Sequence, residues 1–285
     1  MAYSTEDGFQ FTQEDYRQFQ AFLQDACGIV LGENKQYLVA NRMRKILDEL
    51  QISALSQLVQ RIEQAPRSGL KESVINAMTT NETFWFRDAF PFDTLRDVIL
   101  PQLLAEGVQE PLRLWSAACS SGQEPYSLSM IIDEFKRKNP LTLRREPTIV
   151  ATDISSAVLN AARQGSYDRL SLSRGLSDAR LAQFFDEGTD RCYSVKPEIA
   201  ARVDFCSLNL LDSFSGLGTF DVVFCRNVLI YFSAARKQDI LRRIRATLRP
   251  GGCLVLGASE SLPADLSACY QVTRAGTGST YYRAR

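Results

Sequence analysis

The 285-residue chain contains no histidine. This absence excludes every catalytic triad, general base and metal site that depends on an imidazole, and we expect no metal. An excess of charge of one sign is lacking too, because 33 Lys and Arg residues balance 33 Asp and Glu residues. Such a chain has no overall field that favours nucleic acid or an anionic membrane surface. We therefore expect no nucleic-acid partner.

Paired cysteine motifs and long apolar runs are also missing. The seven cysteines are odd in number, scattered and without a C-x-x-C spacing, which favours reduced, buried thiols in a cytosolic protein. No apolar run approaches the roughly 20 residues that span a bilayer, so we expect no membrane insertion. Residues 1–10 are too acidic and polar for a signal peptide. These features predict a cytoplasmic protein.

The chain has the length of about two average domains, taking about 150 residues for each. Residues 1–78 predict a small all-helical domain, because apolar residues recur at helical spacing in four segments that begin near residues 12, 39, 53 and 70. Thr12 and Asp15 resemble a capping box for the first helix, and Ser53 is expected to cap the third.

Residues 79–285 predict a different architecture, in which strands alternate with helices. The predicted strands lie at 112–117, 148–153, 203–208, 220–225 and 253–256. This alternation is typical of an α/β domain with a doubly wound, mostly parallel sheet covered on both faces. Two segments depart from it: residues 165–202 predict an inserted antiparallel β-subdomain, and the tail after Cys269 predicts a closing antiparallel hairpin.

The ends of the first two strands carry the first candidate binding residues. The turn at 115–125 (WSAACSSGQEP) is built of small residues that let the backbone approach a ligand, although a plain tight turn is the alternative. Glu124 suits either a cationic amino group or the helix dipole. Asp153 lies where doubly wound folds place a ribose-binding acid. Its alternative role is a helix cap, for which Ser155 and Ser156 are also available.

Four motifs, in this order along the chain, carry a specific resemblance: residues 78–88 (MTTNETFWFRD), 117–127 (AACSSGQEPYS), 151–154 (ATDI) and 224–232 (FCRNVLIYF). Together they resemble the chemotaxis receptor glutamate O-methyltransferase family, of the CheR type, over nearly the whole chain. The turn at 248–252 (LRPGG) is typical of methyltransferases with this fold. The resemblance implies a class I methyltransferase domain that binds S-adenosylmethionine and releases S-adenosylhomocysteine.

The resemblance also implies the reaction and its residues. The substrates would be glutamate side chains in the cytoplasmic domains of methyl-accepting chemotaxis receptors, whose methyl esters serve sensory adaptation. Catalysis is assigned to Arg87, which would orient the substrate carboxylate, and to Tyr231, close to the transferred methyl. The residues assigned to the cofactor are Asn81, Thr83, Arg87, Glu124, Asp153, Asn209, Leu210, Arg226 and Asn227. Gln123 stands where the family commonly has a second glutamate.

Plainer roles are open for several of these residues. Asn81 and Thr83 are suited to cap a helix, Arg87 to pair with Asp88 or Asp153, and Tyr231 to pack in the core. A glutamate side chain has an ordinary pKa of about 4.3 and is ionised at neutral pH. It needs no general base to attack a methyl group, so the reaction is compatible with a chain that has no histidine.

The sequence identifies the binding partners less closely than it identifies the reaction. Lys35, Arg42 and Lys45 form either a solvated face or a contact with the acidic methylation region of a receptor. In some members of the family the β-subdomain adds a receptor tail peptide as an extra strand, and the sequence leaves open whether this chain does so. A nucleic-acid methyltransferase and an inactive receptor-binding module are the two competing functions. The first needs a D/N-P-P-Y segment where this chain has residues 227–231 (NVLIY).

Overall fold

The computed structural model describes residues 2–4, 10–107, 111–276 and 278–285. A short hairpin, β1 (Ala2–Ser4) and β2 (Gln10–Thr12), precedes four helices, which are α1 (Gln13–Cys27), α2 (Gln36–Leu50), α3 (Leu55–Gln64) and α4 (Leu70–Met78). The helices bury one core, which includes Tyr16, Phe19 and Met43. The capping box is confirmed, since Thr12 Oγ1 accepts from Asp15 N at 3.1 Å and Thr12 N donates to Asp15 Oδ2 at 2.9 Å. The predicted Ser53 cap is wrong: Ala54 precedes α3, with no side-chain cap.

A seven-stranded sheet follows, in the order β11-β12-β10-β9-β3-β4-β8. Its strands are β3 (Arg113–Ala117), β4 (Thr148–Asp153), β8 (Val203–Ser207), β9 (Phe220–Cys225), β10 (Leu248–Leu256), β11 (Tyr270–Arg274) and β12 (Thr280–Ala284). The five strands from β10 to β8 pair in parallel, and β12 pairs antiparallel with both β10 and β11. The doubly wound sheet and its closing hairpin are as predicted.

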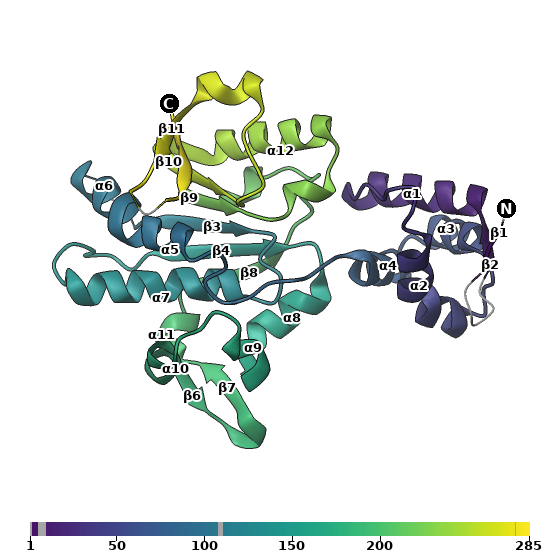
Figure 1. The fold of residues 1–285 in the computed structure, drawn as a ribbon, viewed down its shortest axis with the longest axis horizontal. Helices are drawn as coiled ribbons and strands as arrows, with labels where there is room; N and C mark the ends of the chain where they lie inside the picture. The colour runs from purple at the N-terminus through teal and green to yellow at the C-terminus, as the bar shows by residue number, and fades with distance from the viewer. Residues whose placement is uncertain (1, 5–9, 108–110, 277) are drawn as a thin grey trace.

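Helices cover both faces of this sheet (Figure 1). Successive residues of a strand point to opposite faces, so Leu114 joins a core with α7 while Trp115 joins a core with α12. The covering elements are α5 (Phe90–Thr94), the π-helical turn η1 (Leu95–Ile99), α6 (Leu100–Ala105), α7 (Gln123–Lys138), α8 (Ser156–Gln164) and α12 (Ala234–Thr247). Both faces of the central strands are therefore buried, and their carboxyl ends are left for a site.

The segment at 165–202 forms the predicted antiparallel insertion, which projects from the α7 side in Figure 1. Its three-stranded sheet has the order β5-β7-β6. The elements are β5 (Ser166–Asp168), α9 (Arg169–Ser173), α10 (Asp178–Phe184), β6 (Phe185–Glu187), η2 (Thr189–Arg191), β7 (Cys192–Val195) and α11 (Pro197–Ala200). Trp85 is fully buried and meets Tyr167 and Phe185 edge-on, with ring centroids 4.9 and 5.2 Å away. This packing fixes the 81–89 segment against the insertion.

The helical unit meets the sheet unit through a few specific contacts. Asn209 Nδ2 donates to the Ala26 carbonyl at 2.8 Å, and Val30 N donates to the Tyr231 carbonyl at 2.9 Å. Gly28 ends α1 at φ +78°, and a Cβ there would lie 2.4 Å from the Phe232 ring. Only glycine combines this backbone conformation with so close an approach.

Among the described residues, no helix combines the length and the apolar character needed to cross a membrane.

Candidate active site

A cleft of about 330 Å³ lies where the carboxyl ends of the parallel strands face the α1–α2 connection. All ten residues that the sequence assigned to the site line this cleft: Asn81, Thr83, Arg87, Glu124, Asp153, Asn209, Leu210, Arg226, Asn227 and Tyr231. Ligands of doubly wound sheets bind at this edge. The fold thus brings together side chains from five separate segments of the chain.

The turn between β3 and α7 forms the floor of the cleft. Ala118 and Ser120 have φ values of 59° and 51°, and Gly122 has a φ of 96°. A Cβ at Gly122 would lie 2.9 Å from the Tyr167 hydroxyl, so the glycine serves both the turn and its packing. The curled backbone aims the Ser120 N–H at the second strand, where it donates to Asp153 Oδ2 at 2.8 Å.

Asp153 is held in place by backbone groups. Its Oδ1 accepts from Ser155 N at 2.9 Å, and the side chain is only 6% exposed. Burial raises the pKa of Asp153, and the hydrogen bonds from Ser155, Ser120 and Ile154 oppose this shift. The helix-cap alternative is wrong, because Ser155 caps α8 by accepting from Val158 N. Asp153 is therefore available as an acceptor for a ligand.

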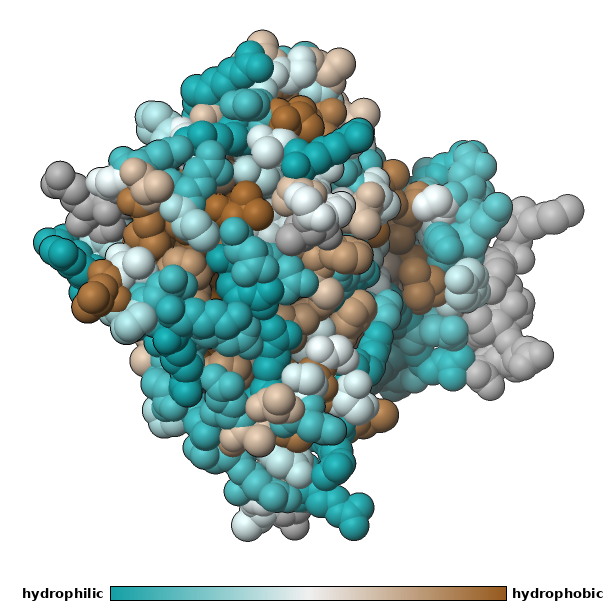
Figure 2. Space-filling view, turned by 60° about the vertical axis from the view of Figure 1, so that its left-hand side comes forward, coloured by the Kyte–Doolittle hydropathy of each residue, from teal (hydrophilic) through white to brown (hydrophobic). Residues whose placement is uncertain are grey.

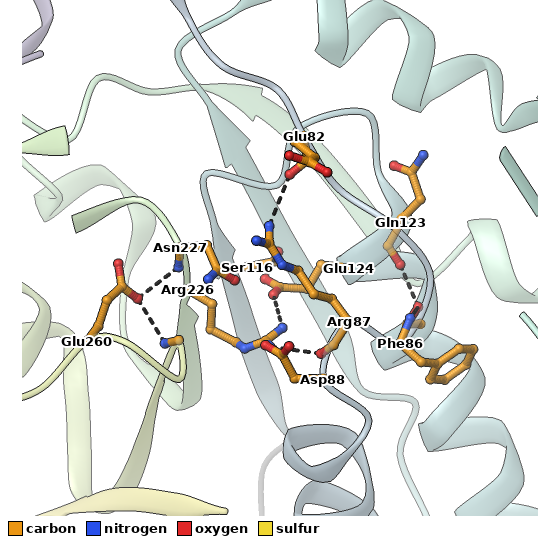
Figure 3. Close-up of polar contacts among 12 residues, drawn as sticks. Glu82, Phe86, Arg87, Asp88, Ser116, Gln123, Glu124, Arg226, Asn227 and Glu260 are labelled. Atoms are coloured by element: carbon orange, nitrogen blue, oxygen red, sulfur yellow. Dashed lines mark hydrogen bonds and ion pairs between the residues drawn. The ribbon is translucent and has the colours of Figure 1, made fainter. Parts of the chain in front are cut away.

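Glu124 and Arg226 form a buried ion pair (Figure 3). Arg226 Nη1 lies 3.1 Å from Glu124 Oε2, while its Nη2 donates to Asp88 Oδ2 at 2.7 Å and to the Arg87 carbonyl at 2.8 Å. Ser116 Oγ donates to the other Glu124 oxygen at 2.7 Å. The Arg226 side chain is 1% exposed, and its Nε is buried without a hydrogen-bond partner in the described part of the chain.

Arg226 also braces the segment that carries Arg87. Phe86, Asp88 and Ala89 have φ values of 49°, 68° and 45°, a strained run for residues other than glycine. Asp88 pairs with Arg226 rather than with Arg87. Arg87 instead donates to the Glu82 carbonyl at 3.1 Å, and its guanidinium lies 5.4 Å from the centre of the Phe84 ring. The guanidinium is thus half-buried at the cleft.

The remaining predicted residues differ in the contacts that their side chains already make within the protein. Asn81 does not cap a helix; its Nδ2 donates to Thr79 Oγ1 at 3.3 Å and its carbonyl accepts from Ser120 Oγ at 2.9 Å. Asn209 uses its amide on Ala26 and accepts from Leu211 N at 3.0 Å, so its side chain ties the two units together. Tyr231 is half-buried: it lines the cleft and also packs against the core on the α12 face of the sheet, so both of its predicted surroundings are present.

The helical unit supplies the opposite wall of the cleft, which was not predicted from the sequence. That wall consists of residues at the end of α1, in the connection after it and on α2, namely Cys27, Ile29, Val30, Leu31, Gly32, Lys35, Leu38 and Arg42. Figure 2 shows hydrophobic residues gathered where the helical unit meets the rest of the molecule. The sequence signal was the apolar run at 29–31 directly after a helix-ending glycine, which is unusual for an exposed connection.

Arg42 does not lie free on a solvated face. Its Nη1 donates to the carbonyls of Met78 and Thr79 at 2.7 and 3.2 Å, and its Nη2 donates to Thr80 Oγ1 at 3.2 Å. The guanidinium therefore fastens α2 to the connection between α4 and the sheet unit. Lys45, on the same helix, is 86% exposed and lies 3.9 Å from Glu49.

Comparison with known proteins gives two family matches. Residues 14–79 match "CheR methyltransferase, all-alpha domain" and residues 81–277 match "CheR methyltransferase, SAM binding domain". The chain is 54% identical to "Chemotaxis protein methyltransferase Cher2" of Pseudomonas putida and to "Chemotaxis protein methyltransferase 1" of Pseudomonas aeruginosa, over 94% of this chain and 97% of each relative. A "Chemotaxis protein methyltransferase 1" of Vibrio cholerae is 45% identical, over 95% of this chain and 97% of that protein.

Proposed function

Because the chain belongs to the CheR methyltransferase family, we propose that it methylates glutamate side chains of chemotaxis receptors, using S-adenosylmethionine. The predicted family, methyltransferase class and cofactor are confirmed by the matches to this family and its SAM binding domain. One observation carries the assignment of residues: all ten side chains predicted for the site line a single cleft. The named relatives, which are chemotaxis protein methyltransferases, support the choice of acceptor.

The donor set of the cleft fits S-adenosylmethionine. Asp153 offers buried carboxylate oxygens to the ribose hydroxyls, and Glu124 offers them to the ammonium group. The buried Nε of Arg226 is a donor without a partner among the described residues, which suits the cofactor carboxylate. Leu210 supplies an apolar surface for the adenine ring. When bound, the cofactor supplies a methyl group on a positively charged sulfur, ready for attack.

Arg87 and Tyr231 are the residues that we assign to methyl transfer. The half-buried Arg87 guanidinium orients the acceptor carboxylate, while its bond to the Glu82 carbonyl limits its own movement. It must hold that carboxylate loosely, because strong pairing in the ground state would reduce its reactivity. Tyr231 shapes the methyl pocket. Positioning of this kind supplies about 7–11 kcal/mol in well-oriented systems, and the apolar helical wall excludes water.

The wider organisation belongs to the same proposal. We assign residues 1–78 to a helical domain and 79–285 to the catalytic domain, with the β-subdomain at 165–202; the separate helical core supports this division. The partners are the cytoplasmic domains of methyl-accepting receptors, so the protein acts in the cytoplasm. In the β-subdomain β5 and β6 are the outer strands, which offers an edge for a receptor tail peptide to join as an extra strand.

The test of this function uses methyl-labelled S-adenosylmethionine and a cytoplasmic fragment of a chemotaxis receptor. Carboxyl methyl esters release volatile methanol in mild base, so we expect base-labile label on the receptor. Label that survives mild base would contradict glutamate as the acceptor. Cofactor binding without label on any receptor would favour an inactive binding module.

A further inference from the structure

Glu260 lies in the loop after β10 and was not among the predicted site residues. Its carboxylate accepts three backbone N–H groups, each at 2.8 Å. Figure 3 draws the two bonds that reach Oε2. Oε2 accepts from Asn227 and Gly257, and Oε1 accepts from Leu229. Asn227 lies in the connection after β9, Leu229 opens the short helix η4 (Leu229–Tyr231), and Gly257 directly follows β10. The carboxylate therefore joins two segments through both of its oxygens.

The backbone at Gly257 approaches the Glu260 carboxylate too closely for a side chain to fit between them. A Cβ at Gly257 would lie 2.7 Å from Glu260 Oε2, 2.9 Å from Asn227 N and 3.0 Å from Asn227 Nδ2. No side chain fits there without displacing either the carboxylate or the 226–229 connection. A glycine at this position is a second, independent sign that the two segments must approach closely.

The fastened connection is strained and carries two residues of the cleft. Asn227 has a φ of 57°, a left-handed conformation that costs about 1–3 kcal/mol unless its surroundings hold it. Glu260 binds the amide of this residue and the amide two positions later, one on each side of Val228. Asn227 and Tyr231 line the cleft, whereas Glu260 lies outside its lining.

We propose that Glu260 is a positioning residue for methyl transfer: by binding the amides of Asn227, Leu229 and Gly257, its carboxylate holds the connection that places Asn227 and Tyr231 at the cleft. This inference rests on the proposed function for the roles of those two residues. A carboxylate is needed because an amide side chain has one acceptor oxygen and turns an N–H donor toward the remaining backbone N–H.

The experiment compares Glu260→Gln and Glu260→Ala with the wild type, and with Glu63→Gln, the same change at an exposed residue of α3. The measurements are the affinity for S-adenosylhomocysteine by calorimetry, the kcat and KM of receptor methylation, and the hydrogen exchange of backbone amides. We expect Glu260→Gln to weaken cofactor binding about tenfold and to lower kcat about tenfold to a hundredfold. Glu260→Ala should have the larger effect, and Glu63→Gln none.

Hydrogen exchange separates positioning from general loss of structure. In Glu260→Gln the amides of Asn227 and Leu229 should exchange faster, while those in the interior of β9 keep their protection. Wild-type kcat and affinity in both Glu260 variants would overturn the proposal. So would rapid exchange of these two amides in the wild-type protein, a test that needs no variant. If the wild type labels no receptor, the proposed function fails, while S-adenosylhomocysteine affinity still tests Glu260.

Discussion

The two walls of the cleft are built in different ways. On the sheet side, Glu124, Asp153 and Arg226 are largely buried, and each is fixed by at least two hydrogen bonds or ion pairs. On the helical side, Val30, Leu31 and Leu38 contribute apolar surface to the cleft. This wall joins the other through single hydrogen bonds, such as the bond from Val30 N to the Tyr231 carbonyl. The sheet wall therefore holds the buried, paired charges, whereas the helical wall is mainly apolar and has Lys35 and Arg42 as its charged members.

The largest expected effect comes from breaking the ion pair in the sheet wall. Arg226→Ala leaves the Glu124 carboxylate buried without its counter-charge, and we expect the free energy of unfolding to fall by about 3–5 kcal/mol. Urea denaturation measures this change. The control is Arg137→Ala: Arg137 is 60% exposed and pairs with Asp133 one helical turn away, a type of pair that contributes about 0.3–0.5 kcal/mol. If Arg226→Ala and Arg137→Ala lower the free energy of unfolding equally, the buried ion pair does not stabilise the protein more than the exposed pair does.

Arg87→Ala should affect chemistry far more than folding. Arg87 lies at the cleft but its described polar contact is a single bond to the Glu82 carbonyl, so its removal should spare the fold. We expect kcat for receptor methylation to fall by about 10²–10³, the usual loss for one electrostatic donor. Arg61→Ala, at an exposed position on α3, is the matched control. If Arg87→Ala retains activity near that of the wild type, the role assigned to Arg87 is wrong.

Asp153 makes the sheet wall sensitive to pH. Burial raises its pKa above the ordinary value of 3.8, so its contribution to the stability of the free protein is lost as the pH rises through that raised pKa. Hydroxyl donors of a bound ribose favour the ionised form. Affinity for S-adenosylhomocysteine should therefore fall as the pH is lowered through the raised pKa of Asp153 in the free protein.

The matched variant is Asp153→Asn, which cannot ionise. It should bind S-adenosylhomocysteine about tenfold or more weakly, because a charged acceptor is lost, and its affinity should vary less with pH. Calorimetry at several pH values provides both curves. Parallel curves for the wild type and the variant would assign the pH dependence to another group.

The sequence predicted one wall much better than the other, for a physical reason. Asp153 ends β4 and Asn227 lies just after β9. The carboxyl ends of these parallel strands meet at one edge, so the convergence of the two residues follows from the strand order. The apolar run at 29–31 gave no such indication, because its position depends on how two separately packed units dock. The bond from Arg42 to Thr79 and the ion pair between Arg226 and Asp88 were likewise invisible, since they join segments that periodicity does not relate.

The smallest expected effect tests the fastening of the helical wall. Arg42→Gln removes the guanidinium that holds α2 to Met78, Thr79 and Thr80, at a partly exposed site where we expect a loss of about 1 kcal/mol in the free energy of unfolding. Lys45→Gln removes the same charge from the same helix, but Lys45 is 86% exposed, so its stability should stay near that of the wild type. Affinity for S-adenosylhomocysteine should fall a few-fold in Arg42→Gln alone, because α2 carries Leu38 of the apolar wall. Equal behaviour of the two variants would mean that charge on α2, rather than this fastening, governs the helical wall.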